Sequence, residues 1–258
     1  HTMIFWFSGC GNTAIVASRL ANQLGEPMQR IDINAPLAYD VTAHQRIIWA
    51  FPVYSWGMPP AVKAFIREVR LTGADSVPHY MVATCGDDAG YTDLKWAREI
   101  SRRGWKASAA HTVIMPNTYV SLPGFDTDPQ ELADRKLADA PEKIKSIAHA
   151  IKCKSNITDV VRGKFAWAKS YILYPLFIRF LMSPKPFQAN KSCTGCGTCS
   201  RSCPMGNIQI INDNPQWGNR CTMCLSCYHR CPIHAVEYGR QTRGKGQYKA
   251  PSRLSEKE

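Results

Sequence analysis

Acidic residues are scarce in the second half of this sequence. The 258 residues carry a formal net charge of +12. Residues 1–150 contain 15 basic and 15 acidic side chains, whereas residues 151–258 contain 17 basic and only 5 acidic ones. The whole positive excess therefore lies in the second half. A basic surface of this kind suits nucleic acid, an anionic membrane or an acidic protein partner.

Several sequence signals are also missing. The apolar run 3–7 has no basic segment before it, and polar, glycine-rich sequence follows at once. We therefore find no secretory signal and expect a cytoplasmic protein. The first glycine-rich loop has no Lys after its last glycine and no G-x-G-x-x-G pattern, which excludes a Walker loop and a dinucleotide fingerprint there. With 45% hydrophobic and 10% aromatic residues, collagen-like and low-complexity classes are excluded as well.

Short apolar runs alternate with helical stretches through the first 150 residues. The predicted strands are 3–7, 29–33, 46–51, 79–84 and 111–115, and the predicted helices are 13–24, 60–69, 92–103 and 129–151. This alternation predicts a doubly wound parallel sheet with helices on both faces. Ligands bind such sheets beyond the carboxyl ends of the strands, so the loops after strands one, three and four form the candidate site.

The loop after the first strand is suited to bind a phosphate group. It reads Ser8-Gly9-Cys10-Gly11-Asn12-Thr13 and leads directly into a helix. Glycines let the backbone approach a ligand closely, and the start of the helix offers unpaired N–H groups at its positive end. Ser8, Asn12 and Thr13 add side-chain donors. The structural alternative is an ordinary glycine-rich turn capped by Thr13.

Two further loops bring aromatic rings to the same edge of the predicted sheet. The candidate residues after strand three are Pro52, Val53, Tyr54, Ser55, Trp56 and Gly57, and those after strand four are Thr84, Cys85, Gly86, Asp87 and Tyr91. A phosphate site facing aromatic loops fits a flat heteroaromatic ring with a phosphorylated tail. For Tyr54 and Trp56, packing against a neighbouring domain or subunit is the alternative.

These loops resemble those of flavodoxins, whose phosphate loop follows the pattern S/T-x-T-G-x-T and whose aromatic loops enclose FMN. The resemblance covers about residues 3–155. It implies the strand order 2-1-3-4-5 and an FMN held by the three loops. Cys10 departs from the pattern, because it stands where the family usually has Thr and a thiol is the weaker donor. Its backbone N–H stays available to a ligand.

Eight of the eleven cysteines form two runs with identical spacing. The runs are Cys193-x-x-Cys196-x-x-Cys199-x-x-x-Cys203-Pro204 and Cys221-x-x-Cys224-x-x-Cys227-x-x-x-Cys231-Pro232. Such dense thiols in a chain without a secretory signal favour metal over disulfides. Two-cluster bacterial ferredoxins have this spacing, and there the fourth cysteine of each run ligates the other cluster. Zinc is the alternative, although zinc sites pair two ligands with two more farther along the chain.

The second half thus resembles the bacterial-type dicluster ferredoxin module over residues 187–240. The resemblance implies one [4Fe-4S] cluster held by Cys193, Cys196, Cys199 and Cys231, and another held by Cys221, Cys224, Cys227 and Cys203. Residues 208–211 and 235–238 are the expected short strands of a small α+β domain. Residues 241–258 contain few apolar side chains and are expected to form a flexible basic tail.

The apolar stretch 165–182 lies inside a predicted helical connector, 156–186, and has three interpretations. Its length approaches that of a bilayer core, but Lys169, Pro175 and Arg179 argue against a simple transmembrane span. Its aromatic residues and the basic residues before it suit a helix lying on a membrane surface. The commoner arrangement is a connector buried between the two domains or in a homodimer interface.

Taken together, the two halves resemble flavodoxin–ferredoxin fusion proteins, found mainly in anaerobic microbes. This resemblance implies an electron-transfer flavoprotein of the oxidoreductase class with FMN, two [4Fe-4S] clusters and no catalytic acid or base. We expect electrons to move between clusters and FMN, coupling one-electron and two-electron partners. The alternative is an FMN-dependent reductase of an organic substrate or quinone. The basic half favours an acidic carrier such as a ferredoxin, or another redox enzyme, and we expect no nucleic acid.

Overall fold

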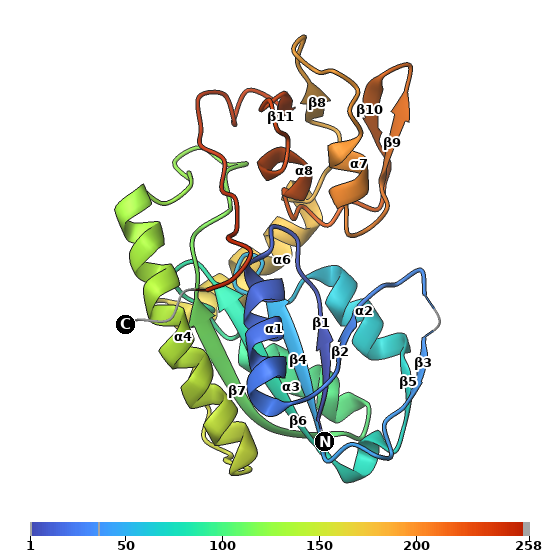
Figure 1. Ribbon diagram of the computed structural model, residues 1–258, viewed down its shortest axis with the longest axis vertical. Coiled ribbons are helices and arrows are strands. Elements are labelled where there is room, and N and C mark those ends of the chain that lie inside the picture. Colours follow the sequence, from blue (N-terminus) through green and yellow to red (C-terminus); the bar gives the residue numbers. More distant parts are fainter. Residues whose placement is uncertain (1, 36, 255–258) are drawn as a thin grey trace.

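The computed structural model describes residues 2–35 and 37–254, which form two domains joined by a helix (Figure 1). The larger domain contains one main sheet with the strands β1 (Thr2–Trp6), β2 (Met28–Arg30), β4 (Arg46–Pro52), β6 (Pro78–Cys85) and β7 (Lys106–Ile114). Its helices are α1 (Asn12–Leu24), α2 (Pro60–Glu68), α3 (Thr92–Arg102) and α4 (Gln130–Lys152), with the 3-10 turn η1 (Ala74–Ser76) before β6. Strand and helix alternate as the sequence predicted.

The main sheet is parallel throughout, in the order β2-β1-β4-β6-β7. Counted along the chain, this is the order 2-1-3-4-5, which confirms the flavodoxin-like fold. The order reverses between β1 and β4, so their carboxyl ends flank the point where ligands bind in such sheets. Strands β3 (Ala38–Asp40) and β5 (Arg70–Thr72) form a separate parallel pair that the sequence analysis did not predict.

β7 begins five residues earlier than the sequence predicted. Its first half is Lys106-Ala107-Ser108-Ala109-Ala110, and small residues of low strand propensity hide a strand from pattern analysis. These residues form a strand because β7 pairs with β6 along almost its whole length, which compensates for their low strand propensity.

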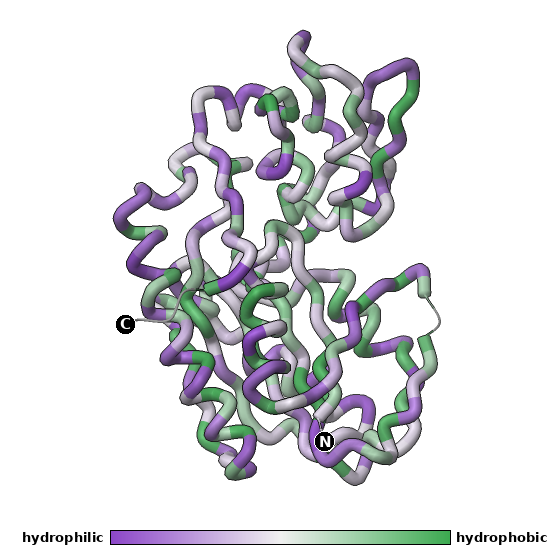
Figure 2. Tube along the Cα trace, in the orientation of Figure 1, coloured by the Kyte–Doolittle hydropathy of each residue, from purple (hydrophilic) through white to green (hydrophobic). Residues whose placement is uncertain are grey.

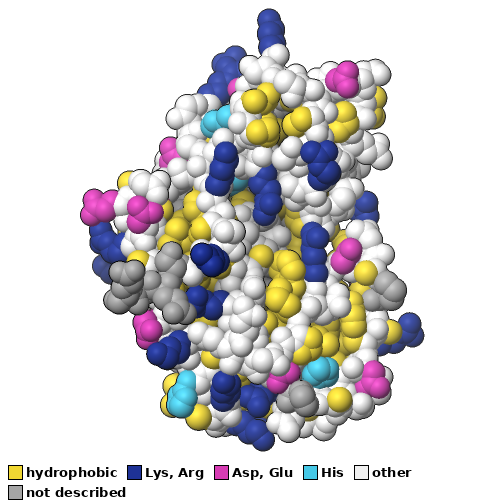
Figure 3. Space-filling model, viewed as in Figure 1, with side chains coloured by type: hydrophobic (Ala, Val, Ile, Leu, Met, Phe, Trp, Pro, Cys, Tyr) yellow, Lys and Arg dark blue, Asp and Glu magenta, His cyan; other side chains and the backbone are white. Residues whose placement is uncertain are grey.

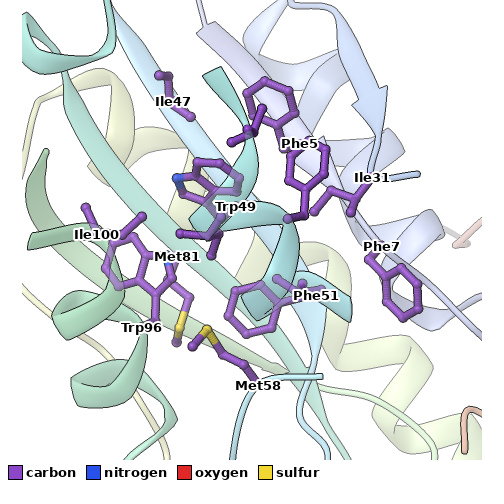
Figure 4. Packing of buried hydrophobic residues seen from close by; sticks show 14 of the residues in the cluster. Phe5, Phe7, Ile31, Ile47, Trp49, Phe51, Met58, Met81, Trp96 and Ile100 are labelled. Carbon is purple, nitrogen blue, oxygen red and sulfur yellow. The ribbon is translucent and has the colours of Figure 1, made fainter. Parts of the chain in front are cut away.

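Alternating strand residues build two cores, one on each face of the sheet. Phe5, Trp49 and Phe51 point to the face that α2 and α3 cover, and Figure 4 shows Trp49 among these rings and Met81. Ile4 and Ile48 point to the opposite face, where α1 and α4 pack. Both cores are fully buried, so the larger domain is stabilised by apolar burial on both sides of its sheet.

Helix α4 shows how the sequence directs this packing. Its residues Ala140, Ile144, Ile147 and Ile151 recur at intervals of three and four and are all buried. Figure 2 shows the result as green hydrophobic positions that alternate with purple hydrophilic ones along the helix. The helix therefore turns one stripe to the sheet and the other to solvent.

The smaller domain contains two antiparallel strand pairs and two short helices. Its elements are β8 (Phe187–Ala189), α7 (Thr198–Ser202), β9 (Ile208–Ile211), β10 (Asn214–Trp217), α8 (Ser226–His229) and β11 (Val236–Tyr238). β9 pairs with β10, and β8 pairs with β11. The predicted strand 208–211 is confirmed, and the strand predicted at 235–238 begins one residue later.

The connector contains one continuous run of helical turns, α5 (Ala166–Ala168), η2 (Lys169–Leu173), α6 (Tyr174–Leu176) and η3 (Phe177–Leu181), of which η2 and η3 are π-helical. Pro175 lacks an N–H and therefore cannot complete an α-helical ladder, which accounts for the wider turns beside it. In the two described stretches, 2–35 and 37–254, no helix has the length and apolar character that crossing a membrane requires.

Residues 241–254 differ from the flexible tail that was expected over 241–258. They run back from the smaller domain along the larger one (Figure 1, red). Tyr248 and Leu254 are buried, and the Tyr248 hydroxyl donates to Asn12 Oδ1 at 2.7 Å. Lys245 Nζ donates to the carbonyls of Val120 and Leu122 at 2.7 and 2.6 Å. The segment therefore ties the two domains together; residues 255–258 of the predicted tail lie outside the described residues.

Candidate functional site

The predicted phosphate loop, residues 8–13, lies between β1 and α1, at the carboxyl edge of the sheet. Gly11 has φ of 110° and immediately precedes α1, so a side chain there would be strained. No side chain caps the first turn of α1. Thr13 does not cap this turn, because its hydroxyl lies 2.7 Å from that of Thr84 in a buried pair. The N–H groups at the start of α1 are of the kind that binds anions at helix N-termini, and their binding of a phosphate stays a prediction.

Most of the predicted cofactor residues surround one cavity, with about 700 Å³ of space that is partly continuous with solvent. They are Ser8, Gly9, Cys10, Asn12, Thr13, Pro52, Val53, Tyr54, Ser55, Thr84, Cys85 and Gly86. Residues 115–119, which follow β7, also line it. The smaller domain contributes Met223, Cys224 and Leu225, and the connector contributes Phe177. The cavity is therefore built by all three parts of the chain.

Trp56, Gly57 and Tyr91 do not line this cavity, because the connector packs on the two aromatic loops. Ser170 Oγ donates to the Trp56 carbonyl at 2.9 Å and accepts from the Tyr91 N–H at 2.7 Å. The Tyr174 ring occupies the space beside Gly57, where a Cβ would collide with it. These residues thus take the domain-packing role that the sequence analysis gave as the alternative for Trp56.

The remaining two predicted residues serve other contacts. Gly11 shapes the loop backbone and lies against Ala250 of the C-terminal segment, where a Cβ would come within 2.8 Å of the Ala250 Cβ. Asp87 points away and lies 3.6 Å from Lys136 Nζ, which also pairs with Asp128 at 2.7 Å. Neither side chain contributes a donor to the cavity.

The Tyr54 hydroxyl is a buried polar atom without a hydrogen-bond partner in the described residues. Burial raises the pKa of Tyr54 well above its usual value, and the neighbouring thiols of Cys224 and Cys10 raise it further. The phenol therefore keeps its proton as a donor. A buried donor without a partner costs free energy, and a polar ligand in the cavity would remove that cost. Together with the helix N-terminus, this donor fits the polar groups of a phosphorylated flavin.

The phosphate loop directly contacts a cysteine of the second run. The Cys10 thiol donates to the carbonyl oxygen of Cys224 at 3.0 Å, and burial raises its pKa to about 12, so it stays protonated. A Cβ on Gly9 would lie 2.5 Å from the Cys224 Cβ. Glycine at position 9 therefore permits this close approach of the two domains. The Cys10 thiol, which stands where the flavodoxin pattern usually has a threonine, is therefore turned to the smaller domain.

The eight cysteines of the two runs separate into two sets. Cys193, Cys196, Cys199 and Cys231 surround one small cavity of the smaller domain; we call them the distal set. Cys203, Cys221, Cys224 and Cys227 form the proximal set. Burial is the main cause that raises the pKa values of Cys221, Cys224 and Cys227, and Cys203 of the same set raises all three further. Outside the set, Cys10 also raises the pKa of Cys224 and Cys199 that of Cys227. Across residues 2–35 and 37–254, no three His, Cys, Asp or Glu side chains gather around a single metal-ion position.

Backbone N–H groups point at several of these sulfur atoms. The N–H of Ala235 donates to Cys231 Sγ at 3.2 Å in the distal set. In the proximal set, Asn207 N–H donates to Cys203 Sγ and Met223 N–H to Cys221 Sγ, both at 3.4 Å. Such bonds stabilise thiolate ligands and raise the reduction potential of an iron–sulfur cluster. Both sets therefore fit the thiolate ligation that their spacing implies.

A basic groove lies beside the phosphate loop, where the two domains meet. Arg201, Arg230 and Lys249 line it together with Cys10 and Tyr248. Figure 3 shows Lys and Arg side chains gathered along this junction on the viewed face, with few acidic ones among them. The groove thus gathers three of the 17 basic residues of the second half.

Comparisons with known proteins found a family model that matches part of the chain and several similar solved structures. Residues 192–236 match the family described as the 4Fe-4S dicluster domain. No curated protein matches the chain. Among solved structures, a flavodoxin of Streptococcus pneumoniae is similar at 15% identity and a TM-score of 0.39, with 59% of this chain and 98% of that one covered. An FMN-dependent NADH-azoreductase of Bacillus anthracis is similar at 11% identity and a TM-score of 0.35, with 57% and 99% covered.

Proposed function

We propose that this chain, in which a flavodoxin-like fold is joined to a 4Fe-4S dicluster domain, is an iron–sulfur flavoprotein that moves electrons between two [4Fe-4S] clusters and FMN. When bound, the clusters would exchange single electrons and the flavin one or two, so the chain would couple one-electron to two-electron partners. The distal and proximal sets would each hold one cluster, and the cavity at the phosphate loop would hold FMN.

One observation carries this proposal: a cysteine of the proximal set lines the same cavity as the phosphate loop. Cys224 is in hydrogen-bond contact with Cys10, and Met223 and Leu225 beside it line the cavity as well. Two separate carriers would have no reason to bury their cofactor sites against each other. The contact supports electron exchange within one chain.

Several residues where the two domains meet support electron transfer between the cofactor sites. Tyr54 lines the cavity, and its hydroxyl is protonated, buried and close to Cys10 and Cys224. Phe177, Met223 and Leu225 give the cavity part of an apolar lining. The C-terminal segment holds the domains in register, because the N–H of Tyr248 donates to His229 of the smaller domain and its hydroxyl donates to Asn12 of the larger one. A fixed distance between cofactor sites favours rapid transfer.

The connector supports a carrier over a reductase of small molecules. It covers Trp56 and Gly57 and is anchored by the Tyr174 hydroxyl, which donates to the Met58 carbonyl at 2.6 Å. An organic acceptor would need an open face at these loops. The basic groove of Arg201, Arg230 and Lys249 instead suits an acidic electron-carrier protein.

Cofactor content and acceptor choice test the proposal together. Anaerobically purified protein should contain about eight iron atoms and one FMN per chain. Reduced low-potential ferredoxin should bleach the flavin, and only another protein should reoxidise it rapidly. Sustained turnover with an organic acceptor or quinone would make the chain a reductase, and zinc in place of iron would refute the cluster assignment.

Two matched cysteine variants sharpen this test. Cys196→Ala removes a ligand of the distal set and should lower iron by about four atoms per chain. Cys153→Ala removes an exposed thiol that belongs to neither set, so iron and FMN should stay unchanged. Equal iron in the two variants would contradict the assignment of the distal set.

A further inference from the structure

The connector exposes large apolar side chains along its outer side. The outer face comprises Phe165, Trp167, Ile172, Leu173, Leu176 and Phe180, of which Phe165 is 82% exposed, Phe180 64% and Trp167 60%. Single exposed apolar residues are common on soluble proteins, but a group of this size on one helix marks an interaction surface. In the structure of residues 2–35 and 37–254, each of these six side chains is at least 45% exposed.

The opposite side of the same helix is packed against the protein. Ala166, Ser170, Tyr174 and Phe177 are buried and recur at intervals of three and four. Ser170 and Tyr174 are hydrogen-bonded to the aromatic loops of the larger domain. The helix is therefore fixed in place by its inner side, and its orientation leaves the outer face free for a partner.

The charged side chains of the connector itself all have one sign after Asp159. No Asp or Glu occurs between Asp159 and Asp213. Exposed Lys164 precedes the outer face, Arg179 lies within it and Lys185 follows it. Lys169 is excluded from this group, because it pairs with Asp88 at 2.7 Å. Aromatic and aliphatic side chains flanked by exposed Lys and Arg are typical of helices that lie in the interface of an anionic membrane.

We propose that the outer face of the connector docks on the surface of an anionic lipid bilayer, with its apolar side chains at the boundary between headgroups and acyl chains. Lys164, Arg179 and Lys185 would then face lipid phosphates. A second copy of the chain fits less well, because a two-fold contact through this helix would bring the basic residues of both copies together without acidic partners. This inference does not depend on the electron-transfer proposal.

Vesicle binding by the complete holoprotein tests the docking. We expect the protein to sediment with vesicles of phosphatidylcholine and phosphatidylglycerol, to bind pure phosphatidylcholine vesicles more weakly, and to be released from the anionic vesicles as salt is raised. Failure to bind the anionic vesicles would overturn the proposal.

Two variants and one control distinguish vesicle binding through the outer face from non-specific binding by other apolar residues. Trp167→Ser/Leu176→Ser/Phe180→Ser should weaken vesicle binding by at least about tenfold, because its apolar contact with the bilayer is lost. Lys164→Gln/Arg179→Gln should weaken it by about fivefold for each charge removed, and it leaves the apolar residues intact should the triple variant fail to fold. Ile211→Ser changes an apolar residue that is 50% exposed on the smaller domain and should have no effect.

The oligomeric state of the protein tests whether the outer face binds a second copy of the chain instead of a membrane. A monomer that binds anionic vesicles supports the proposal. A dimer that the triple variant dissociates, together with absent vesicle binding, would assign the outer face to a second copy and overturn the membrane proposal. Unchanged vesicle binding by both variants would place the lipid contact elsewhere and would overturn it too.

Discussion

The two domains of this chain use different means to build a core. The larger domain buries aromatic and aliphatic residues on both faces of a five-stranded sheet. The smaller domain has a single core, in which Cys199, Cys227 and Cys231 take the place of apolar side chains. A domain this small buries too little apolar surface to be stable by burial alone, and metal ligation is a common remedy. The comparison suggests that the larger domain folds on its own and that the smaller one depends on iron.

Iron removal should have the largest effect, and it should destabilise the smaller domain far more than the larger one. Chelation of the holoprotein should abolish the amide protection of β8 to β11, because their core contains the cluster ligands. Strands β4 and β6 should keep theirs, since apolar residues stabilise them. Hydrogen exchange followed by mass spectrometry measures both at once. Equal loss of protection in the two domains would contradict the comparison.

A core truncation in the larger domain should give the next largest effect. Phe65→Ala removes a ring that is 1% exposed and contacts Phe5 and Trp49, and it should lower the free energy of unfolding by about 3–5 kcal/mol. Urea unfolding followed by far-UV circular dichroism measures this loss. The iron content of the variant should equal that of the unmodified protein. Iron lost in parallel with stability would show that the domains fold as one unit.

Acid should destabilise the larger domain through a buried histidine. Trp49 Nε1–H donates to His79 Nδ1 at 3.0 Å, and burial lowers the pKa of His79 from 6.5 to about 4. Between these two values the unfolded chain binds a proton that the folded chain does not. Stability should therefore fall as pH is lowered from about 6.5 to 4, by on the order of 1 kcal/mol per pH unit, and this contribution should level off below pH 4.

The variant His79→Gln should reduce this pH dependence, because glutamine keeps an acceptor for Trp49 and does not titrate. The matched control is His149→Gln, which changes an exposed histidine of α4. The readout is the slope of the thermal midpoint against pH, which a general loss of stability would not flatten. An unchanged slope in His79→Gln would assign the acid sensitivity to other groups.

The smallest effect should come from the connector, which lies between the two domains. Tyr174→Phe removes the buried hydrogen bond to the Met58 carbonyl and should lower stability by about 1 kcal/mol. Limited proteolysis of residues 165–182 should become about fivefold faster, which is the factor that corresponds to 1 kcal/mol. Tyr171→Phe, on the more exposed side of the helix, is the control and should behave as the unmodified protein.

The features that sequence predicted well are local. Alternating apolar runs predicted the sheet, and the spacing of the cysteines identified the 4Fe-4S domain, because in both cases neighbours along the chain carry the signal. The position of the loop 8–13 at the edge of the sheet was predicted for the same reason, whereas its binding of a phosphate stays a prediction. Trp56 and Tyr91 were expected to enclose the flavin, yet both pack against the connector, some eighty or more residues away in the chain.

The features that sequence missed depend on contacts between distant segments. Met223, Leu225 and Phe177 line the cavity only because the smaller domain and connector fold over the sheet edge. The polar C-terminal segment looked mobile by composition, but Lys245 and Tyr248 find hydrogen-bond acceptors on the larger domain. The sequence contains no periodic pattern that predicts these contacts between distant segments.

The most direct test of the account is the kinetic order of flavin bleaching. Anaerobic holoprotein is mixed rapidly with less than one equivalent of a low-potential donor, and flavin absorbance is followed over a wide range of protein concentration. If electrons pass between the cofactor sites of one chain, the slow phase of bleaching that follows donor consumption should have the same first-order rate at every concentration. A rate that rises in proportion to protein concentration would show transfer between molecules and would contradict the proposed role of the Cys10–Cys224 contact.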